Sequence, residues 1–234
     1  MLGVILVHFN EFFNSPVSII GKFSAIGARC PQLFFIISAY FTWREFDKKK
    51  VPTPIFYKKK LMRIAPLYYV SLVIALLIPT VTLLKHSVMN LLSHLFFVNG
   101  LNPMWNNCIN VEWYISDLML WYLAAPCFFK IVRNLKSAIV AFIISTASSS
   151  AFIFIANQYV ANVMSDSVLD AYFHTQCILI QLPVLFVGVI LYYLKNWKKQ
   201  LAIFTTITII ITGLFILLHL NEKSNPPAML GRMK

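Results

Sequence analysis

Charged residues are scarce in this chain. Only 12% of its 234 residues are Asp, Glu, Lys or Arg, whereas 59% are hydrophobic and the mean hydropathy is +0.73. Soluble domains carry about 25% charged residues, so this chain has too little charge to cover a water-facing surface of its size. Lipid is expected to cover much of it instead, which predicts an integral membrane protein.

Acidic residues are the scarcer of the two charge types. The chain has 8 Asp and Glu against 20 Lys and Arg, which gives a formal net charge of +12. The basic residues form short clusters between apolar runs and do not follow one face. Such clusters are typical of the cytoplasmic side of a membrane protein, so a nucleic-acid partner is not expected.

Glycine, cysteine and histidine are sparse and scattered. The chain has 7 Gly and no internal repeat, so it lacks the paired broken helices that indicate a transporter. Its four cysteines form no CxxC pair, and a disulfide between Cys30 and Cys108 requires that both face an oxidising compartment. Four histidines lie at the edges of loops: His86, His94, His174 and His219. No two of them have metal-ligand spacing, so no metal site is predicted.

Six apolar runs are long enough to cross a bilayer as helices. They cover approximately residues 25–43, 66–84, 112–129, 137–160, 175–194 and 201–220. Residues 1–13 are also apolar but shorter than a span, and they lack the basic start and small-residue cleavage site of a signal peptide. A first helix truncated at its N-terminus fits them better, and residues 88–98 are expected to lie at the interface or to re-enter. The predicted fold is an all-α, polytopic transmembrane bundle, with one domain over 1–220 and a polar tail over 221–234.

The basic clusters predict how these helices are oriented. Segment 44–63 carries eight Lys and Arg and is expected to be cytoplasmic. Alternation then places the basic segments 130–136 and 195–199 inside and the loop 161–174, which has no Lys or Arg, outside. The C-terminal tail does not fit this orientation, because the same alternation would place its basic residues outside the cell. We therefore expect a multi-pass protein of the cell (inner) membrane.

A few ionisable residues occur in or beside the apolar runs, where they are costly and functional by default. His8 and Glu11 are three residues apart and share a helix face, so the carboxylate can orient the imidazole for proton transfer. Alternatively, both meet water at the outer interface. Arg63 is either a topology determinant or a ligand for an anionic phosphate. Asp117 is either a polar group of a site or, like Glu112, a cap of its helix.

Four segments together resemble the acyltransferase-3 family of membrane O-acyltransferases. They are GVILVHF at 3–9, LFFIISAYF at 33–41, FYKKKLMRIAP at 56–66, and HLFFVNGLNP at 94–103 followed by WYIS at 113–116, WY at 121–122 and Pro126. They occur in the family's order and cover about residues 1–129. This chain has Leu118 where the family usually has Glu, with Asp117 adjacent, and it starts after the Arg that normally precedes the family's His.

The resemblance implies transfer of an acyl group, often acetyl, from an acyl-CoA to a hydroxyl of a cell-surface or lipid-linked carbohydrate. It implies that His8 is the general base, that Arg63 binds the phosphates of the donor, and that Trp113, Ser116 and Tyr122 shape the pocket. Acyl-CoA is then a substrate, and no bound cofactor is expected. An inactive family fragment and a transporter or flippase subunit remain the alternatives, and oligomeric state is not predicted.

Overall fold

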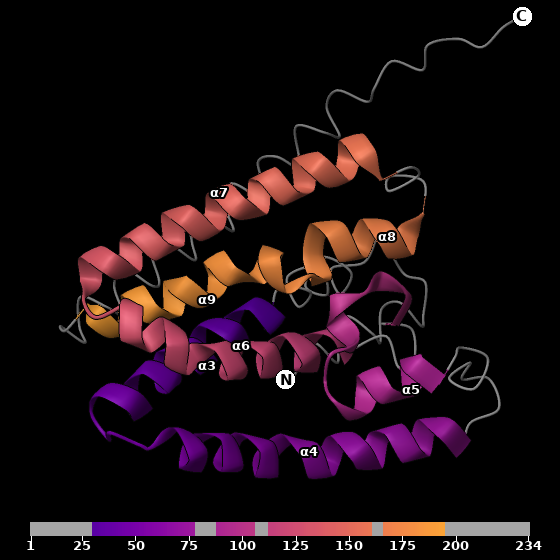
Figure 1. Ribbon diagram of the computed structural model, residues 1–234, viewed down its shortest axis with the longest axis horizontal. Helices are drawn as coiled ribbons and strands as arrows, with labels where there is room; N and C mark the ends of the chain where they lie inside the picture. The colour runs from indigo at the N-terminus through magenta and orange to yellow at the C-terminus, as the bar shows by residue number, and fades with distance from the viewer. Residues whose placement is uncertain (1–29, 78–87, 106–111, 161–165, 195–234) are drawn as a thin grey trace, which may run out of the picture. The chain divides into compact units, whose positions relative to one another are not determined.

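The described part of this computed structural model consists of helices and their connections. It covers residues 30–77, 88–105, 112–160 and 166–194, and these segments contain no strand (Figure 1). The longer helices are α3 (Cys30–Asp47), α4 (Thr53–Leu77), α6 (Glu112–Ile131), α7 (Leu135–Tyr159) and α9 (Ile178–Tyr193). The shorter elements are α5 (Val88–Leu95), the 3-10 turns η2 (Asn99–Leu101) and η3 (Pro103–Trp105), α8 (Ser167–Ala171) and the π-turn η4 (Tyr172–Gln176). All the helices above belong to one compact unit, residues 1–193.

The all-helical prediction is confirmed for these segments. Within them, two stretches are long and apolar enough to cross a membrane, Leu135–Tyr159 and Val168–Tyr193. The first is α7, with 25 residues, and the second joins α8, η4 and the 16 residues of α9. The run 201–220 lies outside the described residues. The count of six spans therefore stays a prediction.

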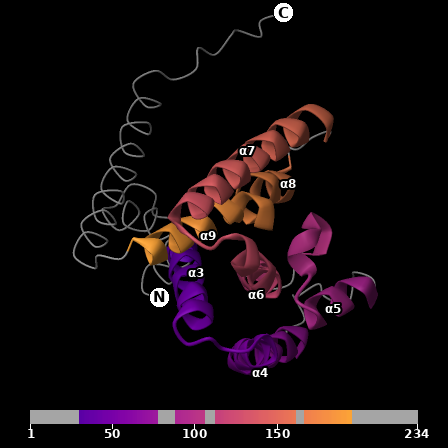
Figure 2. The ribbon, with the colours of Figure 1, turned by 60° about the vertical axis from the view of Figure 1, so that its left-hand side comes forward.

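Helices α3 and α9 approach each other closely because a glycine faces α3. A Cβ atom at Gly188 would lie 2.2 Å from the carbonyl oxygen of Ile36 and 2.9 Å from the Cβ of Ala39. Small residues at such a contact allow two backbones to approach where no hydrophobic force drives them together. Helix α7 lies along α9 on another side, as Figures 1 and 2 both show.

The C-terminal ends of α3, α6 and α9 lie at one end of this unit. The carbonyl oxygen of Val132, just after α6, accepts a hydrogen bond from Trp43 Nε1 of α3 at 3.4 Å and from the Tyr193 hydroxyl of α9 at 2.8 Å. The Tyr192 hydroxyl donates to the carboxylate of Asp47. We call this the basic end, because the basic segments 44–63 and 130–136 adjoin it.

Aromatic packing forms the core next to the basic end. Trp43 stacks on Trp121 with ring centroids 5.6 Å apart, and Phe186 meets the edge of Trp121 at 5.8 Å. Such ring pairs stabilise beyond their buried area, by about 0.5–1.5 kcal/mol each. They connect α3, α6 and α9 where few polar contacts are available.

Helix α4 begins earlier than the apolar run 66–84 indicated, because Thr53 and the lysines after it are already helical. It is joined to the rest by hydrogen bonds from Tyr57 to the carbonyl oxygen of Leu123 and from Tyr69 to that of Leu95, at 2.9 and 2.8 Å. Much of its apolar surface is exposed, for example Leu67 at 77%. In a membrane this surface is expected to contact lipid.

We expect Gly188→Ala to destabilise the protein, because its new methyl group would collide with the α3 backbone. Overpacking of this kind costs about 1–3 kcal/mol, which outweighs the gain in helix propensity of about 1 kcal/mol. Thermal unfolding of the detergent-solubilised protein measures the effect. Ala147→Val, at an exposed position of α7, is the matched control. An unchanged melting temperature for Gly188→Ala would contradict the close contact.

Candidate functional site

Six buried polar side chains gather at the N-terminal end of α6, away from the basic end. They come from α5, η2 and the first turns of α6, and each is at most 1% exposed. We call this set the polar cluster: Asn90, His94, Asn99, Glu112, Ser116 and Asp117. Buried polar groups at membrane depth are costly unless they are paired or functional, so the cluster is the strongest candidate site in the described residues.

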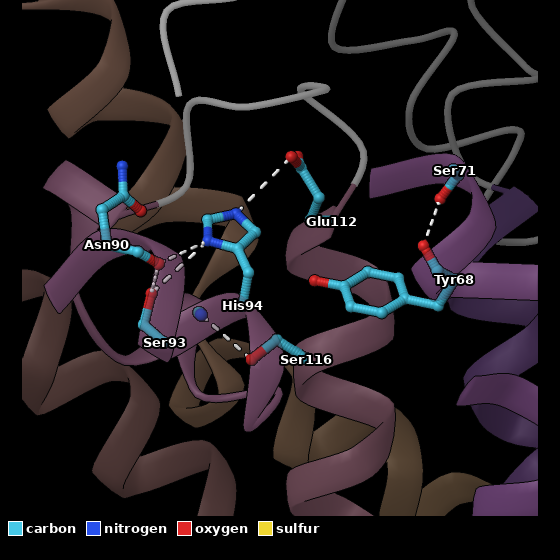
Figure 3. Close-up of polar contacts among 8 residues, drawn as sticks. Tyr68, Ser71, Asn90, Ser93, His94, Glu112 and Ser116 are labelled. Atoms are coloured by element: carbon cyan, nitrogen blue, oxygen red, sulfur yellow. Dashed lines mark hydrogen bonds and ion pairs between the residues drawn. The ribbon is translucent and has the colours of Figure 1, made fainter. Parts of the chain in front are cut away.

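His94 is held in one orientation by its own helix. Its Nδ1 lies 2.8 Å from the carbonyl oxygen of Asn90, one turn earlier in α5 (Figure 3). A carbonyl oxygen can only accept a hydrogen bond, so Nδ1 carries the proton. Nε2 therefore faces the carboxyl of Glu112, with 3.6 Å between Nε2 and Oε1. This distance is too long for a hydrogen bond, and both side chains are almost fully buried.

The hydroxyl of Ser116 connects α6 to the turn that follows α5. It donates to the carbonyl oxygen of Phe97 at 2.8 Å and accepts from the backbone N–H of Gly100 at 2.9 Å. This turn depends on both hydrogen bonds of Ser116 and on a glycine at position 100. Phe97 has a φ of 58°, a strained value for a bulky residue, and a Cβ at Gly100 would lie 2.8 Å from Ser116 Oγ. Ser116 therefore positions the loop as a structural bridge, and its contact with substrate stays a prediction.

Asp117 lies beside this bridge and is fully buried. Neither of its carboxyl oxygens has a hydrogen-bond partner, so it does not cap α6. Asp117 Oδ1 would lie 3.2 Å from a Cβ at Gly100, which places its carboxyl against η2. The next residue, Leu118, is also buried but belongs to the hydrophobic core. The two neighbours thus face different surroundings, as expected for adjacent positions of a helix.

Of the other predicted binding residues, Trp113 lies in the first turn of α6 beside Glu112, and Tyr122 lies near the middle of the helix. Trp113 is half-buried and packs against Phe35 of α3, with ring centroids 6.3 Å apart. Tyr122 is nine residues further along α6, a rise of about 13 Å. Its ring meets the edge of Phe56 and lies 4.9 Å from the ammonium of Lys60. The structure therefore does not bring Trp113 and Tyr122 to one place.

Arg63 is exposed on α4. Its neighbour Lys60 is instead tied to Glu45 of α3 at 3.0 Å. Lys58 and Lys59 are exposed like Arg63, so the first half of α4 presents cations to its surroundings. This arrangement fits the predicted role of Arg63 toward an anion but does not test it.

The predicted catalytic residues His8 and Glu11 lie outside the described residues. Among the described ones, no group of three or more His, Cys, Asp or Glu side chains is placed to hold a metal ion. Sequence reasoning did not identify His94 and Asn90 as members of a site. The spacing of His94 and Asn90 by one helical turn could have indicated that they share a helix face. The approach of His94 to Glu112, in contrast, depends on tertiary structure.

We expect Ser116→Ala to lower the stability of the protein, because it leaves the buried N–H of Gly100 without an acceptor. An unpaired buried donor costs about 1–3 kcal/mol, and thermal unfolding in detergent measures it. Ser145→Ala is the matched control, since the buried Ser145 hydroxyl only donates to Phe142 in its own helix. Equal melting temperatures for the two variants would contradict the bridging role.

Comparison with known families identifies the chain. Residues 1–226 match the acyltransferase-3 family model, which describes an acyltransferase domain. No curated protein and no solved structure matches the chain. The family match extends well beyond residues 1–129, where the sequence motifs lie, and members of this family are membrane proteins. The chain therefore belongs to the acyltransferase-3 family and is a membrane acyltransferase.

Proposed function

We propose that this acyltransferase is a multi-pass protein of the cell (inner) membrane that moves an acetyl group from acetyl-CoA to a carbohydrate hydroxyl. The acceptor is a cell-surface or lipid-linked carbohydrate. The family supplies the reaction class. The observation that carries the proposal is the exposed basic face of α4 at the basic end, formed by Lys58, Lys59 and Arg63. Exposed cations beside a membrane suit the phosphates of a CoA thioester that arrives from the cytoplasm.

Arg63 has the best chemistry for the donor. Its planar guanidinium offers paired donors to phosphate oxygens, and its charge persists at any physiological pH. Lys60 is less suited, because its ammonium already contacts Glu45 and the rings of Phe56 and Tyr122. Within the described residues, this leaves Arg63 and the two exposed lysines to attract the donor.

In the proposed reaction, the imidazole of His8 removes the proton of the acceptor hydroxyl, and Glu11 orients the ring. The hydroxyl oxygen attacks the carbonyl carbon of the thioester, and the C–S bond breaks. The CoA thiolate leaves and takes the proton back from the imidazolium. The products are an O-acetyl ester and CoA, so the step needs no bound cofactor.

We expect Arg63→Ala to raise the KM for acetyl-CoA roughly tenfold to a hundredfold, because a hydrogen bond to a charged group contributes about 1.5–3 kcal/mol. The measurement is transfer of labelled acetyl to cell-envelope polysaccharide as the acetyl-CoA concentration varies. Arg133→Ala is the matched control, since Arg133 is also an exposed arginine of the basic end and lies 4.7 Å from the ring of Phe129. An equal rise in both variants would show general charge attraction and not a site at Arg63.

We expect His8→Ala to lower the rate of acetyl transfer by about 10²–10⁴, the usual contribution of a general base. Glu11→Gln should reduce it less, because the imidazole remains. The same labelled-acetyl assay measures both variants. His174→Ala is the control, because His174 pairs with Asp170 in the α8–η4 segment at 2.9 Å. Full activity in His8→Ala would remove His8 from the mechanism.

A further inference from the structure

The side-chain amide of Asn90, like the carboxyl of Asp117, is a polar group of the cluster without a hydrogen-bond partner. Its side chain is 1% exposed, and neither Nδ2 nor Oδ1 has a hydrogen-bond partner. An unpaired amide in an apolar interior is costly. A leucine of similar size would avoid this cost, so stability alone does not explain the amide.

His94 presents a second unfilled position next to this amide. Asn90 and His94 are one turn apart in α5, so their side chains are neighbours on one face of the helix. Because Nδ1 donates to the carbonyl oxygen of Asn90, a neutral His94 offers Nε2 as an acceptor. That atom has no hydrogen-bond partner. In Figure 3 the amide of Asn90 and the carboxyl of Glu112 lie on either side of the His94 ring.

The chemistry of these atoms selects the type of ligand. A hydroxyl group both donates and accepts, so it can donate to His94 Nε2 while it accepts from Asn90 Nδ2. A phosphate or carboxylate is disfavoured by the carboxyl of Glu112, and no cationic side chain belongs to the polar cluster to offset it. The exposed cations of α4 lie at the basic end. The anionic donor and a neutral, hydroxyl-rich ligand therefore suit opposite ends of α6.

We propose that Asn90, His94 and Glu112 form a subsite that binds a hydroxyl group of the carbohydrate acceptor. This inference rests on the proposed function, because it assigns the acceptor of the same reaction. Asn90 and His94 hold the hydroxyl. Glu112 Oε1 lies 3.6 Å from the same Nε2, so its carboxyl borders the bound hydroxyl and completes the polar surface. The acceptor then approaches from the end of α6 that is predicted to be extracytoplasmic.

The experiment compares the purified full chain with Asn90→Leu, which keeps the size of the side chain and removes its hydrogen-bonding atoms. Ser93→Ala is the matched control, because Ser93 is buried on the same turn and its hydroxyl donates to the carbonyl oxygen of Asn90. Methyl glucoside and methyl galactoside serve as probes. Permethylated methyl glucoside serves as the probe without hydroxyl groups. Melting temperatures are measured with and without each probe.

Without a probe, Asn90→Leu should melt at the same temperature as the wild type or higher, since an unpaired amide is replaced by an apolar group. A methyl glycoside should raise the melting temperature of the wild type and of Ser93→Ala but not that of Asn90→Leu. The permethylated probe should raise none of them. A lower melting temperature for Asn90→Leu without probe would make the amide structural and overturn the subsite. So would an equal glycoside effect in all three proteins, or none in the wild type.

Kinetics separate this inference from the proposed function. With labelled acetyl-CoA and methyl glycosides, Asn90→Leu should raise the KM for the glycoside about tenfold, which corresponds to about 1.4 kcal/mol. The KM for acetyl-CoA should stay unchanged. Equal increases in both KM values would overturn the subsite. Absence of any transfer by the wild type would overturn the proposed function, and the melting temperatures would still decide whether the glycosides bind at Asn90.

Discussion

A bilayer offers no water to satisfy polar groups, and this constraint explains most of the arrangement described above. Each backbone group must find its partner within the protein, so the connections between helices use side chains as partners for exposed carbonyls. The Val132 carbonyl oxygen accepts from two aromatic residues, and Ser116 satisfies a carbonyl and an N–H at once. Against this background, the unpaired amide of Asn90 and carboxyl of Asp117 are exceptions. Exceptions of this kind are where a membrane protein is expected to meet its ligand.

Helix α6 connects the two chemical environments of the chain. Its C-terminal end adjoins Lys130 and Arg133 and the exposed cations of α4, whereas its first turns carry Glu112 and Asp117. This polarity follows the macrodipole, which favours acidic groups at the start of a helix and basic groups at its end. An acyl transfer between a charged donor and a neutral acceptor needs two such environments. A single helix that spans both provides a rigid spacing between them.

The sequence predicted the helical class and the positions of most helices, because apolar runs of about 20 residues have few alternatives in lipid. The predicted start of α4 was Pro66, because an apolar run shows where a helix enters the lipid and not where its first turn begins. Lysines are good helix formers, so α4 extends back to Thr53. The run 175–194 was expected to be one helix, yet the chain turns at Cys177 between η4 and α9.

The candidate site was less predictable than the fold. Ser116 was identified through a family motif and Asp117 as an ionisable residue in an apolar run, but neither signal shows that Ser116 bonds to Gly100 and Phe97. His94 was counted among scattered histidines, because Glu112 is 18 residues away in sequence and approaches it only in the tertiary structure. The pairing depends on a strained φ at Phe97 and on a glycine at position 100. Neither is recognisable as a site from the sequence.

The unequal lengths of α7 and α9 have a consequence for the surrounding membrane. The 25 residues of α7 extend about 37 Å, longer than a hydrocarbon core of about 30 Å, whereas the 16 residues of α9 extend only about 24 Å. Helix α9 alone is too short to cross this layer, so the crossing stretch Val168–Tyr193 includes the π-turn η4 and the break at Cys177. Helix α7 must tilt, and the break before α9 must lie within the hydrocarbon layer or pull it inward.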